Sequence, residues 1–151
     1  MNIVIEPLSD EAAACIAGWH YDPPFDFYDF AAEPDDLAEL LDPARRGDRY
    51  FGAFDEAGEL IGFFYLAKRE SEVEIGLGLR PDVTGRGLGA AYLENGLEFA
   101  RSRFGLDRFR LSVATFNERA IKVYERAGFR RVRTETRHLA LGDFEFLEME
   151  R

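Results

Sequence analysis

The sequence predicts a mixed α/β fold, and three observations support this prediction. Segments in which apolar and polar residues alternate, such as residues 2–8 and 71–79, are typical of β-strands. Other segments carry apolar residues every three or four positions, which is the spacing of an amphipathic helix. The two kinds of segment follow one another in the order β-α-α-β-β-β-α-β-α-β-β over 151 residues, without repeats or a linker. We therefore expect residues 1–151 to form a single domain with one core.

The first half of the chain is expected to contain three strands and two helices. Residues 2–8 form the first strand, and residues 9–19 form a helix with Ser9 as its N-cap. Prolines interrupt residues 21–34, so this segment is predicted to be irregular, and residues 35–42 form the second helix. Residues 49–70 are interpreted as two strands joined by a turn at Ala57-Gly58.

The second half contains a further strand and then two helices alternating with strands. Residues 71–79 form the strand, after which the apolar period changes to that of a helix. The apolar stripe of this helix consists of Leu93, Leu97, Ala100 and Phe104. A strand over residues 108–115 and a helix over residues 117–128 follow. Residues 129–141 and 144–151 form the last two strands, around a turn at Gly142-Asp143.

Composition excludes several classes of protein. The net charge of −10 argues against general binding to nucleic acid, and no apolar run is long enough to span a membrane. The first 19 residues lack the pattern of a secretory signal, and the one cysteine, Cys15, forms no internal disulfide, so we expect a cytoplasmic protein. One cysteine and two histidines predict no metal site. Residues 1–79 hold 18 acidic and 5 basic residues, whereas residues 80–151 hold 11 and 14, which suggests that the second half meets an anion.

The segment TGRGLG, residues 84–89, places three glycines at alternate positions at the start of a predicted helix. The first N–H groups of a helix have no intrahelical partner, and the helix dipole puts partial positive charge there. Glycines would let this backbone wrap closely around phosphate oxygens, and Arg86 adds a positive charge. The spacing is neither that of a P-loop nor that of a Rossmann fingerprint. Taken alone, the segment fits either an anion site or a purely structural turn.

The strand before this loop carries Gly76 and Gly78 on one face. Glycine inside a strand often marks the close approach of a ligand or of another part of the chain. Glu72 and Glu74 share the same face if no bulge intervenes. A long ligand could run along the strand and place its phosphates in the loop, which would suit a phosphate-tailed cofactor.

The segment LGLRPDVTGRGLGAAYL, residues 77–93, resembles the core motif of the GNAT superfamily of N-acetyltransferases, a strand followed by an (Arg/Gln)-x-x-Gly-x-(Gly/Ala) loop. The resemblance implies a mixed, mostly antiparallel sheet of six or seven strands with splayed central strands and about four flanking helices. It also implies acetyl-CoA as co-substrate, with its pantetheine arm paired to the backbone of Leu77, Gly78 and Leu79. The implied pyrophosphate site consists of Thr84, Gly85, Arg86, Gly87, Leu88 and Gly89. Thr84 replaces the usual Arg or Gln, although its hydroxyl can still donate one hydrogen bond.

The segment NERAIKVYERAGF, residues 117–129, matches the second motif of this family, Asn-x-x-Ala-x-x-x-Tyr-x-x-x-Gly-Phe. Asn117 and Tyr124 are seven residues apart, nearly two helical turns, so they lie on one face of the helix. An ordinary tyrosine hydroxyl is protonated at neutral pH and could protonate a departing thiolate. Taken alone, the helix favours a core tyrosine and an ordinary Asn cap. With the resemblance, Asn117 is expected to contribute to cofactor binding and Tyr124 to act as general acid.

The expected reaction is direct attack of an acceptor amine on the thioester carbonyl. Glu74 is the first candidate for the base that takes the amine proton and Glu72 the second, although both also fit solvent-facing carboxylates. A backbone amide near Leu77–Leu79 would polarise the carbonyl. An acetyl-enzyme on Cys15 is disfavoured, because the same helix carries Ile16 and Trp19 and is expected to pack.

Residues 21–44 contain eight acidic residues, no basic ones and several aromatic residues. In the resembling family this region forms much of the acceptor pocket. Our hypothesis is a cationic amine acceptor held by carboxylates, among them Asp26 and Asp29, and by aromatic faces. Trp19 and His20 could line the same pocket, although a packed Trp19 and an exposed His20 are favoured. A solvated loop that aromatic residues anchor to the core explains the composition equally well.

Two other functions fit the same motifs. One is a non-catalytic acyl-CoA-binding or sensing domain, and the other is an acetyltransferase for peptide or protein amines. The apolar hairpin segment LIGFFYLA, residues 60–67, is expected either to pack internally or to form the face of a homodimer.

Overall fold

The computed structural model describes residues 1–151 as seven strands with five α-helices and three short 3₁₀-helices. The α-helices are α1 (Asp10–Ala17), α2 (Pro34–Leu41), α3 (Pro43–Arg46), α4 (Gly89–Phe104) and α5 (Glu118–Arg126). The strands are β1 (Val4–Pro7), β2 (Tyr50–Phe54), β3 (Leu60–Arg69), β4 (Glu72–Leu79), β5 (Phe109–Ala114), β6 (Arg130–Leu139) and β7 (Gly142–Glu150). The 3₁₀-helices are η1 (Phe25–Tyr28), η2 (Phe30–Ala32) and η3 (Pro81–Val83). The predicted order is therefore observed, with α3 and the 3₁₀-helices added.

The strands are hydrogen-bonded in the order β1-β2-β3-β4-β5-β7-β6. The pairs β1–β2, β2–β3, β5–β7 and β6–β7 are antiparallel, whereas β4 and β5 pair in parallel. The β4–β5 ladder contains two residue pairs, Val73–Phe109 and Glu74–Arg110, although β5 continues to Ala114 in register with β7. The mixed, mostly antiparallel sheet expected from the sequence is confirmed.

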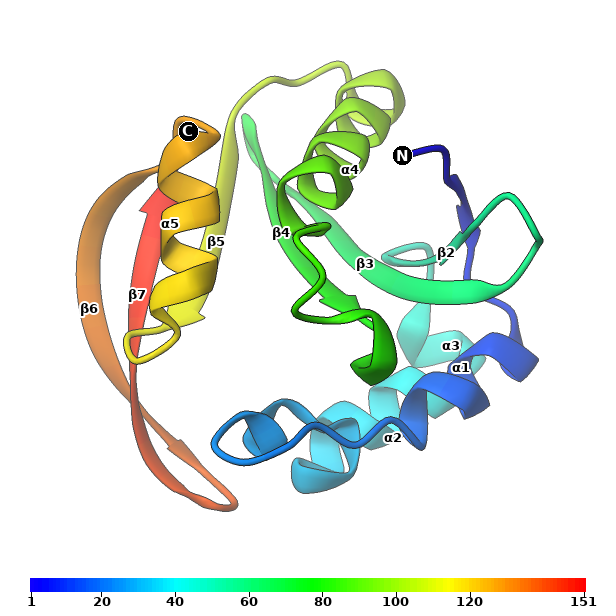
Figure 1. The fold of residues 1–151 in the computed structure, drawn as a ribbon, viewed down its shortest axis with the longest axis horizontal. Helices are drawn as coiled ribbons and strands as arrows, with labels where there is room; N and C mark the ends of the chain where they lie inside the picture. Colours follow the sequence, from blue (N-terminus) through cyan, green and yellow to red (C-terminus); the bar gives the residue numbers. More distant parts are fainter. The chain divides into compact units, whose positions relative to one another are not determined.

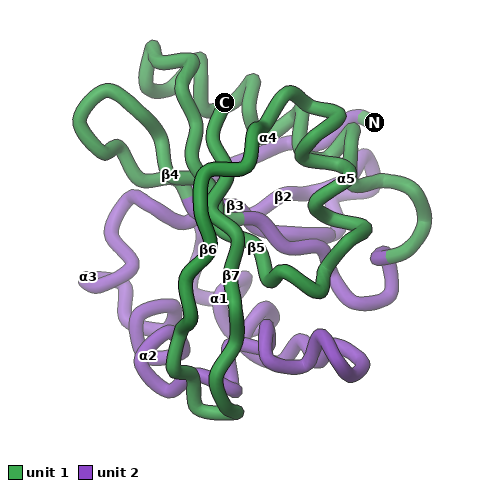
Figure 2. Tube along the Cα trace, turned by 90° about the vertical axis from the view of Figure 1, so that its left-hand side faces the viewer, with its two compact units in different colours: residues 1, 66–76, 85–151 green, residues 2–65, 77–84 purple.

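The chain divides into two compact units, each assembled from separate stretches of sequence (Figure 2). Unit 1 contains residue 1, residues 66–76 and residues 85–151, and unit 2 contains residues 2–65 and 77–84. Because the divisions fall inside β3 and β4, each unit holds part of both strands.

In unit 2, α1 and α2 bury an apolar face. The hydroxyl of Ser9 accepts a hydrogen bond from the N–H of Ala12 at 3.1 Å, so the predicted N-cap is confirmed. The buried residues of this core are Leu8, Ala12, Ala13, Ile16, Leu40 and Tyr50. Arg46 is only 5% exposed and donates to the Leu40 carbonyl at 2.7 Å and to the Asp10 carboxylate at 2.6 Å. Its guanidinium therefore joins the C-terminal end of α2 to the first turn of α1.

In unit 1, α4 buries three of the four residues of the predicted apolar stripe: Leu93, Leu97 and Ala100 have no exposed surface, whereas Phe104 is only half-buried. Figure 1 shows α5 lying alongside β5 and β7. Asn117 caps α5, because its side chain accepts from the Ala120 N–H at 3.4 Å. The N-terminal ends of both helices, which the family motifs single out, thus belong to the same unit.

The β6–β7 turn lies two residues earlier than predicted. Leu139 pairs with Gly142, so Ala140 and Leu141 form the turn in place of Gly142-Asp143. The φ of 135° at Gly142, which glycine adopts readily, lets β7 begin directly after the turn. The hairpin segment 60–67 buries Ile61 and Phe64 within the chain. None of the helices has the length and apolar character needed to cross a bilayer.

Candidate active site

At two of the three alternating glycines, the backbone conformation itself favours glycine. Gly85 and Gly87 have φ values of 72° and 75°, in the left-handed region that residues with a Cβ atom rarely adopt. A Cβ atom at Gly87 would meet no atom within 4 Å, so conformation and not lack of space explains that glycine. Gly89 has a different role, since it is the first residue of α4. The loop therefore turns tightly twice and then enters a helix.

The N-terminus of α4 carries no cap from the protein itself. Its N-cap residue, Leu88, has no side-chain acceptor for the first N–H groups, and the first turn contains no acidic residue. By contrast, α1 and α5 each have a capping side chain and an acidic residue in the first turn. Because uncapped helix N–H groups carry partial positive charge, the start of α4 favours an anion supplied from outside.

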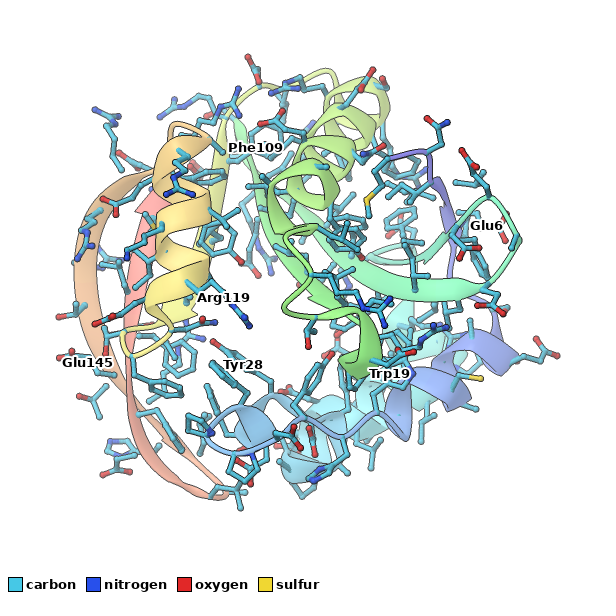
Figure 3. All side chains as sticks on the ribbon, viewed as in Figure 1. Glu6, Trp19, Tyr28, Phe109, Arg119 and Glu145 are labelled. Atoms are coloured by element: carbon cyan, nitrogen blue, oxygen red, sulfur yellow. The ribbon has the colours of Figure 1, made fainter.

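Two arginines add full positive charge to this region of unit 1. Arg86 lies in the loop, and Arg119 reaches it from the first turn of α5, with its Nη1 3.4 Å from the position of a Cβ on Gly85. Both side chains are exposed, and neither forms an ion pair with a carboxylate. Figure 3 shows the Arg119 side chain extending from the start of α5, away from β7. The two guanidinium groups are thus available to an anionic ligand.

Arg119 was not among the site residues predicted from the sequence. One helical turn after it, Val123 lies 3.7 Å from the position of a Cβ on Gly89, so one face of α5 follows the glycine loop. The spacing of four residues between Arg119 and Val123 was available in the sequence. The contact with the loop was not, because it depends on how α4 and α5 pack.

Tyr124, the predicted general acid, follows Val123 on α5 and is half-buried. Its ring packs edge-to-face against Phe129, with ring centroids 6.0 Å apart and an interplanar angle of 62°. The backbone carbonyl of Tyr124 also accepts from the N–H of Phe129 at 3.0 Å. The last turn of α5 therefore holds the ring in one place, as a group in contact with reacting atoms requires.

The two candidate bases on β4 have different surroundings. Glu72 accepts a hydrogen bond from Nε of Arg110 at 2.9 Å, and the same guanidinium also binds Glu148 and Glu150 of β7. Glu74 is 45% exposed, and its nearest charged partner is Arg69, at 3.5 Å. The Arg110 network thus holds Glu72 in a structural role, whereas Glu74 stays accessible.

The end of β4, in unit 2, is closely packed on one face. A Cβ atom on Gly78 would lie 2.4 Å from the Phe63 ring, so the space beside this glycine is filled by a side chain of the neighbouring strand β3. The Thr84 hydroxyl donates to the Pro81 carbonyl at 2.7 Å and thereby closes η3. Its proton is therefore used locally, which differs from the expected donation to a ligand.

The acidic segment of unit 2 is held together by one of its own carboxylates. Asp29 accepts from the backbone N–H of Tyr21 at 2.9 Å and pairs with Nδ1 of His20 at 2.6 Å, and its side chain is only 11% exposed. Asp26, on η1, makes no such contact. Of the two carboxylates predicted to hold an acceptor, Asp29 instead orders the segment, which leaves Asp26 as the candidate.

The hydrogen bond from His20 to Asp29, together with the negative charge of Asp29, raises the pKa of His20 above its ordinary value. We expect the NMR titration midpoint of His20 to lie above about 6.5 and to fall when Asp29 is replaced by Asn. The pair should stabilise the fold fully below pH of about 6.5 and lose this contribution as pH rises through the raised pKa. Asp143→Asn, which alters the partner of the other histidine, should leave the His20 titration unchanged.

The chain is similar in sequence to known proteins. Residues 9–129 match the Acetyltransferase (GNAT) family. The mycothiol acetyltransferase of Salinispora tropica is 39% identical over 100 residues, covering 58% of this chain and 33% of that protein. That of Streptomyces coelicolor is 39% identical over 108 residues, covering 69% and 31%. The chain thus spans about a third of the length of these relatives.

Solved structures share the fold. Spermidine N-acetyltransferase from Vibrio cholerae, in complex with CoA and spermine, has a TM-score of 0.79 at 19% identity and covers 99% of this chain and 94% of that one. A GNAT-family acetyltransferase from Bacillus anthracis has a TM-score of 0.76 at 14% identity, with 100% and 95% covered. At this identity the likeness concerns the fold, and it confirms the predicted architecture. Together with the family match over most of the sequence, it leads to one assignment: the chain belongs to the GNAT family of acetyltransferases.

Proposed function

We propose that this chain transfers the acetyl group of acetyl-CoA to a primary amine by direct attack. The observation that carries the proposal is the start of α4, where an uncapped helix N-terminus follows two left-handed glycines and two guanidinium groups lack carboxylate partners. A pyrophosphate supplies the missing negative charge and the missing acceptors.

Each remaining group of the cofactor has a proposed partner. The loop residues Gly85 to Gly89 and Arg119 bind the phosphates, and Asn117 contributes from the start of α5, whereas the hydroxyl and N–H of Thr84 are both used on the Pro81 carbonyl. The stretch Leu77 to Leu79 pairs with the pantetheine arm through the backbone groups that point away from β3, apart from the Leu79 carbonyl, which accepts from Tyr21. One N–H of this stretch polarises the thioester carbonyl, because a donor aimed at the developing oxyanion stabilises the transition state.

The chemical step is proposed to use two side chains of unit 1. The amine nitrogen attacks the carbonyl carbon while Glu74 takes a proton from it, directly or through a water molecule. The C–S bond then breaks, and Tyr124 donates its proton to the departing sulfur. The products are an N-acetylated amine and CoA with a free thiol.

The acceptor is proposed to be a small cationic amine. Asp22 and Asp26 on the segment around η1 remain for recognition, since the Asp29 carboxylate is held by the backbone N–H of Tyr21 and by His20. Trp19 and Phe30 pack against Phe63 but are only partly buried, so they are the aromatic residues proposed to contact the cation. Among similar proteins, one is named for spermidine and was solved with CoA and spermine, which supports an amine of this kind.

Two measurements test the proposal. Calorimetry should detect binding of acetyl-CoA, and a thiol-release assay should show CoA production with a panel of spermidine, tyramine and a short peptide with a free N-terminus. Release with the two small amines and not with the peptide is the expected result. Binding without release would point to a non-catalytic acyl-CoA-binding domain, release with the peptide alone to a peptide acetyltransferase, and no binding at millimolar concentration would refute the proposal.

Replacing Arg119 with Met should weaken acetyl-CoA binding roughly five- to tenfold, the effect of losing one exposed charge-assisted contact. The deficit should shrink as salt is raised, because screening already weakens this contact in the unmodified protein. Arg126→Met is the matched control, since this exposed arginine lies in the last turn of the same helix. Equal affinities for the two variants would remove Arg119 from the site.

A further inference from the structure

Tyr21 joins the acidic segment of unit 2 to the last residue of β4. Its hydroxyl donates a hydrogen bond to the Leu79 carbonyl oxygen at 2.6 Å, across 58 residues of sequence. Burial, and secondarily the charge of Asp29, raises the pKa of Tyr21 well above its ordinary value, so the hydroxyl keeps its proton and remains a donor. This contact is not part of any helix or strand ladder.

The carbonyl that Tyr21 contacts lies on the free edge of β4. Neighbouring residues of a strand point their backbone groups to opposite edges. The N–H of Arg80 donates to Ile61 of β3 at 2.8 Å, so the groups of Leu79 point to the edge away from β3. Leu79 lies beyond Glu74, the last residue of β4 that pairs with β5. Leu79 therefore has no strand partner on this edge, and Tyr21 occupies its carbonyl.

The segment around Tyr21 is ordered by three further contacts, one polar and two aromatic. The backbone N–H of Tyr21 is fixed by Asp29, as described above. Phe63 of β3, whose ring covers Gly78, also contacts Phe30 edge-to-face at 5.4 Å and Trp19 at 6.4 Å between ring centroids. The polar contact thus holds residues 19–30 together, and the aromatic contacts hold them to Phe63, the ring that covers Gly78 near the end of β4.

We propose that Tyr21 is a positioning residue that fixes the acceptor-side segment, residues 19–30, against the free edge of β4 at Leu79. The inference rests on the proposed function, because this edge is the one assigned to the pantetheine arm. By fixing this segment, Tyr21 sets where the acceptor amine is held relative to the cofactor strand. Its role is geometric, and it takes no part in proton transfer.

The test is the variant Tyr21→Phe, assayed with the fastest amine of the panel above. Loss of the hydroxyl should raise the acceptor KM about tenfold while the acetyl-CoA Kd, from calorimetry, stays within about twofold. Asp29→Ala removes the carboxylate that accepts from the backbone N–H of Tyr21, and it should also raise the acceptor KM about tenfold without changing the acetyl-CoA Kd. The double variant should be less than additive, since both substitutions release the same segment.

Tyr50→Phe is the matched control, because Tyr50 is another buried tyrosine of unit 2 whose ring packs on Tyr65. It should leave the acceptor KM unchanged even if the melting temperature falls. An unchanged acceptor KM in both Tyr21→Phe and Asp29→Ala, or an equal loss of acetyl-CoA affinity, would overturn the inference and leave the proposed function standing. Failure of the unmodified protein to bind acetyl-CoA would instead refute the proposed function, and this inference with it.

Discussion

Tyr124→Phe should lower kcat by roughly 10²-fold or more, the range typical of removing a positioned general acid. The substitution keeps the ring, and with it the edge-to-face contact with Phe129 at 6.0 Å. It also leaves the loop and the guanidinium of Arg119 untouched. Binding of acetyl-CoA should therefore survive while departure of the thiolate becomes slow, because no proton donor replaces the phenol.

Two measurements separate this result from a loss of folding. Calorimetry should give an acetyl-CoA Kd within about twofold of the unmodified protein, and single-turnover kinetics should place the deficit in the chemical step. Phe129→Leu serves as the control for the aromatic contact alone, since it loosens the ring of Tyr124 and keeps the hydroxyl. A Tyr124→Phe enzyme with normal kcat would show that the phenol only packs.

Most of the fold could be predicted because its helices and strands have local sequence signals, such as an apolar period or an N-cap residue. The stripe Leu93, Leu97 and Ala100 is buried as its period requires, and both Ser9 and Asn117 cap the helices that they were predicted to cap. The helix α3 was not predicted, because four residues are too few to show a helical period. The β6–β7 turn was misplaced by two residues, since Gly142-Asp143 has the composition of a turn although Ala140 and Leu141 form it.

Within the candidate site, the glycine loop is the part that could be predicted from the sequence. Gly85, Gly87 and Gly89 were singled out because glycines at a predicted helix start let the backbone approach an anion closely, and the structure adds that Gly85 and Gly87 have positive φ. The contacts that a charged side chain makes in the fold are not visible in the sequence. Asp29 was expected to hold an acceptor and instead orders its own segment, and Arg119 approaches Gly85 through the packing of two helices. Which partner a charged side chain takes is settled by tertiary contacts between distant parts of the chain.

The two carboxylates on β4 that the sequence left as alternatives for the base differ in their contacts. Glu72 and Glu74 share one face of the strand, yet Arg110 binds only Glu72 within hydrogen-bond distance, at 2.9 Å, in a network that includes Glu148 and Glu150. The Glu72 carboxylate is thus engaged by a guanidinium N–H and its side chain is only 23% exposed, so an incoming amine has less access to it. Glu74 has only the longer contact with Arg69 and almost half of its side chain exposed.

Glu74→Gln should therefore reduce kcat roughly 10²- to 10³-fold with little change in acetyl-CoA affinity, because the amide cannot take the proton of the attacking amine. Glu72→Gln is the matched control on the same strand face: it should keep kcat within a few fold and lower the melting temperature, since it leaves part of the Arg110 charge without a partner. Steady-state kinetics and thermal denaturation of the two variants side by side decide the matter. The opposite pattern, with kcat lost in Glu72→Gln and kept in Glu74→Gln, would move the base to Glu72. Normal kcat in both would mean that the amine loses its proton to water before it attacks.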